Sequence, residues 1–209
     1  MNRFAIHSLA TLAAVCISAL AHAHSDLISV DATFSPTSRK DSKVSNKQLN
    51  TIEEGTMNGI KYSFYLSDAS GTIAGTQAND IGPRSDFAKN WHTSCKKDVM
   101  TDQVFCKAIK ENLTFFYTKE LGFVVGIMEQ RYPGTGVSIR IDNGQVFSSN
   151  DAIFPPQVSA KILAQIKDGS KVATRYVSWP EKANVDRVSD FYGAGVAAAY
   201  VKWAFGQIK

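Results

Sequence analysis

The sequence predicts a mostly β, α+β fold: a twisted antiparallel sheet or sandwich with two late helices. Short segments in which apolar and polar residues alternate run through the middle of the chain, and this alternation is the period of a β-strand. Glycine, asparagine, aspartate and proline separate these segments, as they do at turns. Helical periodicity is found only after Pro155, so the helices should follow most of the strands.

The first strands follow from the alternation alone. Every second residue from Ile60 to Leu66 is apolar, and residues 68–71 have the composition of a turn. Residues 75–86 are rich in glycine, asparagine, aspartate and proline and predict a loop. Four more strands are expected, at residues 91–95, 104–109, 113–118 and 123–128.

A hairpin and a first helix come next. Asn143-Gly144 lies between the alternating residues 137–142 and the apolar pair at 146–147, and an Asn-Gly pair in this position is a strong hairpin signal. Pro155-Pro156 then opens a helix with one apolar face, which we expect to end at Gly169.

The C-terminal part predicts one more strand and the second helix. The strand covers residues 171–179 and is stopped by Pro180. The helix is expected from about Ser189. Gly193 and Gly195 each weaken it by about 1 kcal/mol relative to alanine, but they allow its start to approach the sheet closely.

The N-terminus predicts export. Arg3 supplies a positive charge, residues 4–20 are apolar or small apart from His7, and Ala21-His22-Ala23 has the small-x-small form of a signal-peptidase site. The alternatives are a membrane anchor and lipidation at Cys16. The apolar run is short for a membrane span, no basic stop-transfer flank follows it, and the residues before Cys16 lack the usual leucine. We expect cleavage near Ala23, a periplasmic or secreted protein, and no transmembrane segment in the mature chain.

Three regions are expected along the chain: a signal peptide at residues 1–23, a polar flexible arm at 24–58 and a single β-rich domain at 59–209. The arm is rich in serine, threonine and lysine and has too few apolar residues to pack a core. The chain has 23 basic and 19 acidic residues, with no basic run interleaved with aromatic residues. Nucleic acid is therefore not expected as a partner.

Cleavage would leave two cysteines, Cys95 and Cys106. An even number of cysteines in an oxidising compartment predicts a disulfide, which here would link two neighbouring strands. A redox-active pair is expected to have the Cys-x-x-Cys spacing, and two ligands cannot close a structural zinc site, so the sequence favours neither.

Residues 91–205 resemble a known family. Trp91 is followed by Cys95 and Cys106, by paired strands, and by the segment VSIRIDNG at residues 137–144; a helix, a basic strand and a closing helix complete the order. This order resembles the invasion-associated locus B proteins of Gram-negative bacteria, which are exported, β-rich and not known for catalysis. The chain departs from that family in lacking a second cysteine pair after the Asn-Gly turn, and residues 24–88 have no counterpart in it. The resemblance implies fold and export more than activity.

The sequence offers little catalytic chemistry. It contains no Gly-x-Ser-x-Gly, Walker, His-Glu-x-x-His or dinucleotide-binding motif, so we expect neither an enzyme nor a bound cofactor. Cleavage after Ala23 would make His24 the first residue, and its amine and imidazole could bind Cu(II) together with His92. We favour the alternative, in which His24 is a frayed terminus, His92 is a surface residue and no metal is bound.

The candidate binding surface comprises Arg140, Arg175, Tyr132 and Tyr176. Arg140 lies between two apolar residues of its strand, so its side chain points away from theirs. If Arg175 shares that face, the two guanidinium groups could bind an anionic group beside a tyrosine. The alternative is that both are solvent-facing arginines that pair with Asp142 or Glu181.

These features predict a non-catalytic accessory protein that binds an envelope or host macromolecule. The alternatives are a small-ligand or copper-binding protein and an exported enzyme inhibitor. The periodicity also predicts one main core, made up of Tyr62, Phe64, Trp91, Phe123, Ile139, Ile162, Trp179 and Trp203.

Overall fold

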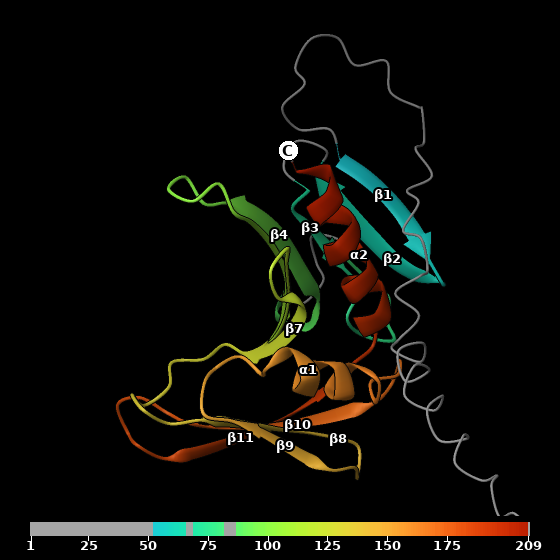
Figure 1. Ribbon diagram of the computed structural model, residues 1–209. Helices are drawn as coiled ribbons and strands as arrows, with labels where there is room; N and C mark the ends of the chain where they lie inside the picture. The colour runs from blue at the N-terminus through green and yellow to red at the C-terminus, as the bar shows by residue number, and fades with distance from the viewer. Residues whose placement is uncertain (1–51, 66–68, 82–86, 209) are drawn as a thin grey trace, which may run out of the picture.

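Two antiparallel sheets and two late helices form the part of the chain that the computed structural model describes, as the sequence predicts (Figure 1). That part is residues 52–65, 69–81 and 87–208. The larger sheet contains, in this spatial order, β1 (Ile52–Met57), β2 (Ile60–Tyr65), β3 (Gly71–Ile73), β4 (Trp91–Lys97), β5 (Val104–Lys110), β6 (Leu113–Thr118) and β7 (Gly122–Ile127). The smaller sheet has the order β11 (Asn184–Asp190), β10 (Lys171–Val177), β8 (Val137–Ile141) and β9 (Val146–Ser149). The helices are α1 (Pro156–Leu163) and α2 (Ala194–Gln207), and a short 3-10 turn, η1 (Phe87–Lys89), precedes β4.

The larger sheet is a meander that begins earlier than predicted. Asn58 and Gly59 connect β1 to β2 with φ angles of 52° and 79°, and positive φ at both central residues is the mark of a type I′ hairpin turn. Residues 52–57 therefore belong to the sheet, although the sequence analysis assigned them to the arm at 24–58. The rest of that arm, residues 24–51, lies outside the described residues.

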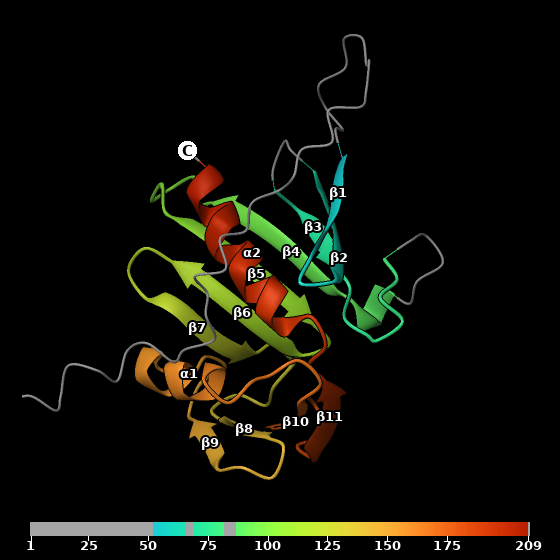
Figure 2. The same cartoon turned by 90° about the vertical axis from the view of Figure 1, so that its right-hand side faces the viewer.

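Helix α2 covers one face of the larger sheet and closes its core (Figure 2). Its buried side is mostly alanine, which lets the helix backbone lie near the strands. Gly193 precedes the helix with φ 76°, and a Cβ atom placed there would lie 2.2 Å from the carbonyl oxygen of Ala74. The expected close approach of the helix start is thus confirmed at Gly193.

The predicted core is largely confirmed, with one error. Five of its members are buried: Tyr62, Phe64, Trp91, Ile139 and Ile162. Phe123 and Trp203 are half-buried and pack against these residues. Trp179 is 46% exposed, because β10 ends at Val177 and Trp179 lies in the connection that follows.

Two boundaries in the C-terminal half also differ from the prediction. Helix α1 ends at Leu163, and Gly169, with φ 88°, lies in the turn before β10. The segment from 184 to 190 is strand β11, so α2 begins at Ala194 and not near Ser189. Strand β11 was not predicted, because its two apolar residues, Val185 and Val188, do not alternate with polar ones.

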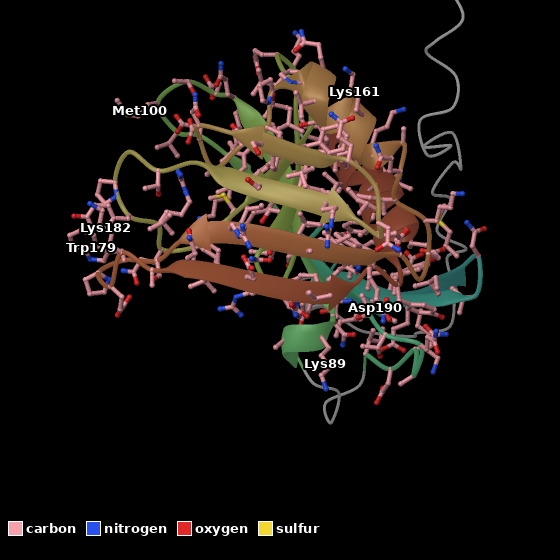
Figure 3. The ribbon with its side chains drawn as sticks, turned by 90° about the horizontal axis from the view of Figure 1, so that it is seen from below. Lys89, Met100, Lys161, Trp179, Lys182 and Asp190 are labelled. Carbon is pink, nitrogen blue, oxygen red and sulfur yellow. A yellow bond between two sulfur atoms is a disulfide. The ribbon has the colours of Figure 1, made fainter. Side chains whose placement is uncertain are left out.

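The smaller sheet has one covered face and one open face. Its inner face carries buried side chains from β8, β9 and β10 that join the core together with α1. Its outer face is turned away from α1 and from the larger sheet, and Figure 3 looks towards this side of the molecule. The outer face is the surface on which the predicted arginines lie.

Candidate functional site

Arg140 and Arg175 share the outer face of the four-stranded sheet. Cross-strand pairing places Arg140 opposite both Val146 and Ala173, and Ala173 opposite Val188, so these residues form one row across β9, β8, β10 and β11. Arg175 belongs to the next row, between Ser138 and Asp186. The condition stated from the sequence, that both arginines lie on one face, is met.

A hollow of about 320 Å³ lies on this face. It is lined by Ser138, Ile139, Arg140, Val146, Ala173, Thr174, Arg175, Asp186 and Val188. The hollow exists because Ala173, with a single side-chain carbon, is surrounded by longer residues: Arg140 and Val188 across the sheet, and Lys171 and Arg175 along β10.

Arg175 is held by an acidic partner from β11. Its Nε and Nη2 atoms donate to the two carboxylate oxygens of Asp186, each at 2.6 Å, which is a bidentate pair. This hydrogen bonding raises the pKa of Arg175 and lowers the pKa of Asp186, so both groups are charged at neutral pH. The pair is exposed, so its geometry matters more for orientation than for stability.

Arg140 is exposed and, within the described residues, has no carboxylate at ion-pair distance. Asp142, the partner considered from the sequence, instead accepts hydrogen bonds from the Lys171 N–H and the Ser170 hydroxyl. Val188 and Val146, in the same row as Arg140, are 70% and 53% exposed. The face thus combines a cation without an acidic partner and two exposed apolar side chains.

The two predicted tyrosines do not join this face. Tyr176 alternates with Arg175 along β10, so its side chain is buried on the inner side, where its hydroxyl lies 3.5 Å from Nη2 of Arg187. Tyr132 packs against Trp179 with ring centroids 5.3 Å apart, and the Lys182 ammonium group lies over its ring. Tyr132 therefore packs against the connection between β10 and β11, where Figure 3 labels Trp179 and Lys182.

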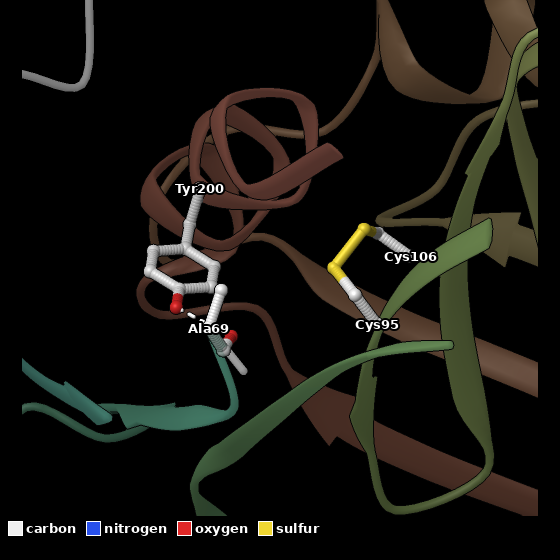
Figure 4. The surroundings of a disulfide bond; sticks show 4 residues. All are labelled: Ala69, Cys95, Cys106 and Tyr200. Carbon is white, nitrogen blue, oxygen red and sulfur yellow. Dashed lines mark hydrogen bonds between the residues drawn. A yellow bond between two sulfur atoms is a disulfide. The ribbon is translucent and has the colours of Figure 1, made fainter. Parts of the chain in front are cut away.

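The predicted disulfide between Cys95 and Cys106 is confirmed. The two residues are directly opposite each other on β4 and β5, with Cα atoms 4.0 Å apart (Figure 4). In the same view, the hydroxyl of Tyr200 on α2 donates to the carbonyl oxygen of Ala69 at 2.6 Å.

The copper hypothesis has no structural test, because His24 lies outside the described residues. His92 is half-buried on β4. Within residues 52–65, 69–81 and 87–208, no group of three or more histidine, cysteine, aspartate or glutamate residues could hold a metal ion.

A polar junction fixes the smaller sheet to the larger one. Lys110, at the end of β5, is only 4% exposed, and its Nζ atom donates to the carbonyl oxygens of Gly75 and Asp190. Burial lowers the pKa of Lys110, while the charges of Asp190 and Glu111 oppose this shift. Because Asp190 ends β11, its hydrogen bond with Lys110 links the smaller sheet to β5 of the larger one.

Four residues on which the site depends were not predicted from the sequence as members of it: Val146, Ala173, Asp186 and Val188. Asp186 and Val188 are on the strand that was not predicted. Ala173 could have been found, because residues 171, 173 and 175 alternate along a strand that was predicted, and an alanine between Lys171 and Arg175 indicates a gap.

No protein-family model matches this chain, and no curated protein or solved structure is significantly similar to it. In the described part of the chain, no helix is both long and apolar enough to cross a membrane.

Proposed function

We propose that this protein is an exported, non-catalytic accessory protein that binds another macromolecule, of the cell envelope or of a host, through the outer face of its four-stranded sheet. The main support for this proposal is the row in which Arg140 lies between Val146 and Ala173 with no acidic partner among the described residues. Arginine is enriched in the residues that dominate binding energy, and exposed apolar side chains beside it supply area to bury.

Export is part of this proposal. The N-terminal pattern of Arg3, an apolar run and Ala21-His22-Ala23 favours it, and the Cys95–Cys106 disulfide fits an oxidising compartment. The resemblance of residues 91–205 to the invasion-associated locus B proteins points in the same direction.

A small-ligand binding protein is the second candidate. The hollow over Ala173 favours it, since 320 Å³ is at the lower end of the range of about 300–1,000 Å³ found for ligand pockets.

The test compares three tagged full-length proteins: wild type, Arg140→Glu, and Lys161→Glu as a control for a charge reversal at an exposed position on α1. Envelope partners are cross-linked, identified by mass spectrometry, purified and titrated against each protein. We expect Arg140→Glu to weaken binding at least about tenfold, the effect of about 1.4 kcal/mol, while Lys161→Glu binds as wild type does. All three should melt at similar temperatures, because both sites are exposed. Equal binding by wild type and Arg140→Glu would refute the assignment of this face.

A further inference from the structure

We propose that the hollow over Ala173 is a binding site for a carboxylate carried on an aliphatic stem, with Arg140 as the charged partner and Val146 and Val188 as the apolar walls. This inference rests on the proposed function and names the chemical group that the outer face receives. It follows from the charges on the face, from the shape of the hollow and from the apolar residues that border it.

The charge on this face favours an anion. Arg175 offsets the charge of Asp186, so the repulsion between the Asp186 carboxylate and an incoming carboxylate is reduced. The bidentate pair with Asp186 uses Nε and Nη2 of Arg175 and leaves the Nη1 hydrogens available. Arg140 keeps all of its donors, because no described residue accepts from them. An anion above Ala173 would therefore meet one unpaired guanidinium group and a second one held in a fixed orientation.

The walls of the hollow favour an apolar stem behind that anion. Val188 and Val146 are the exposed apolar side chains of the row, at opposite ends of it, and Ala173 leaves room between Arg140 and Val188. A bare anion such as phosphate would pair with Arg140 but would leave both valines in water. A carboxylate that pairs with Arg140 would lay a short alkyl chain over Ala173 against Val188, and each methylene fully removed from water strengthens binding about fourfold.

Two sources could present this group: a free short-chain carboxylate, or the side chain of a glutamate on a protein partner. The probes are therefore acetate, hexanoate, inorganic phosphate and the blocked peptide acetyl-Leu-Glu-Leu-amide. Each is titrated into the ¹⁵N-labelled exported protein, and binding is followed by amide chemical shifts. We expect shifts confined to the neighbourhood of Ala173 and Arg140. We also expect hexanoate to bind about fifteenfold more tightly than acetate, which corresponds to half-burial of its four extra carbons.

Two variants separate charge from shape. Arg140→Ala removes the cation, and Ala173→Leu fills the hollow while leaving every charge in place. Both should abolish binding of hexanoate or of the peptide, whereas Lys161→Ala should not change it. Whichever of hexanoate and the peptide binds more tightly identifies the source. Equal affinity for acetate and hexanoate, tighter binding of phosphate, or hexanoate binding retained in Ala173→Leu would overturn the proposal.

The outcomes also distinguish this inference from the proposed function. If no carboxylate probe binds but capture of the macromolecular partner still requires Arg140, the inference is wrong and the proposed function stands. If hexanoate binds and the partner does not require Arg140, the site exists but does not serve that partner.

Discussion

Removal of the Cys95–Cys106 disulfide should destabilise the protein by about 3 kcal/mol. The two cysteines are 11 positions apart, so the bridge closes a loop of about a dozen residues, and the chain-entropy relation gives about 3 kcal/mol for a loop of this length. A domain of 150 to 250 residues loses roughly 2–4 °C of melting temperature per kcal/mol, so reduction should lower it by about 6–12 °C.

The assay compares oxidised wild type, reduced wild type and the Cys95→Ala/Cys106→Ala variant by urea denaturation. Reduction tests the cross-link alone. The double variant also removes two sulfur atoms, one of them from the fully buried Cys106, so it should be less stable than reduced wild type. Added reductant should have no effect on the double variant, which is the control for unspecific effects of the reagent.

Unfolding of reduced and oxidised wild type at the same urea concentration would refute a stabilising effect of the cross-link. In that case the unfolded chain would already hold β4 and β5 together. The hairpin tip has its own hydrogen bonds, from the N–H of Asp98 to the carbonyl oxygen of Gln103 and from two backbone N–H groups to the Asp98 carboxylate. A protein purified after export with two reactive thiols would contradict the disulfide itself.

Three further predictions concern other parts of the chain. Trp91→Phe should cost about 1–3 kcal/mol in chemical denaturation, because the indole N–H that donates to the Tyr192 carbonyl oxygen is lost. Trp91→Ala should cost about 3–5 kcal/mol, because the buried ring is lost as well. A Trp91→Phe cost near zero would contradict a role for the hydrogen bond. Burial lowers the pKa of Lys110, so between that lowered pKa and 10.5 the unfolded chain binds a proton that the folded chain has released. The free energy of unfolding of wild type, relative to that of Lys110→Met, should therefore rise with pH in this range. A difference in stability that does not change with pH would refute the lowered pKa. N-terminal sequencing of exported protein should find His24 as the first residue, whereas an intact Met1 would contradict the predicted cleavage.

Local patterns were enough to predict most of the fold. Strands with strict alternation, such as β2 and β8, were found because a strand that buries one face must alternate. Strand β11 was not predicted, because it is a mostly exposed edge strand, and such a strand need not alternate apolar and polar residues. Strand β1 was not predicted for the same reason, because it lies at the edge of the larger sheet and none of its side chains is fully buried.

The candidate site was predicted only in part. Alternation within one strand was enough to place Arg140 on the outer face, and the same rule applied to residues 171–177 would have separated Tyr176 from Arg175. The partner of Arg175 could not be predicted, because Asp186 approaches it from a strand that the sequence does not reveal.

The sequence by itself determined the mostly β fold with two late helices, the pairing of Cys95 with Cys106, and the presence of one arginine on each of two predicted strands. The fold class and the strand positions depend on residues close together in the chain, and the two cysteines left after cleavage can form only one disulfide. Only the tertiary structure decided that Ala173 makes a hollow, that Asp186 neutralises Arg175 and that Arg140 stands without an acidic partner. These features depend on cross-strand register, in which a shift of one residue would exchange the two faces of the sheet, and register is set by packing over the whole domain.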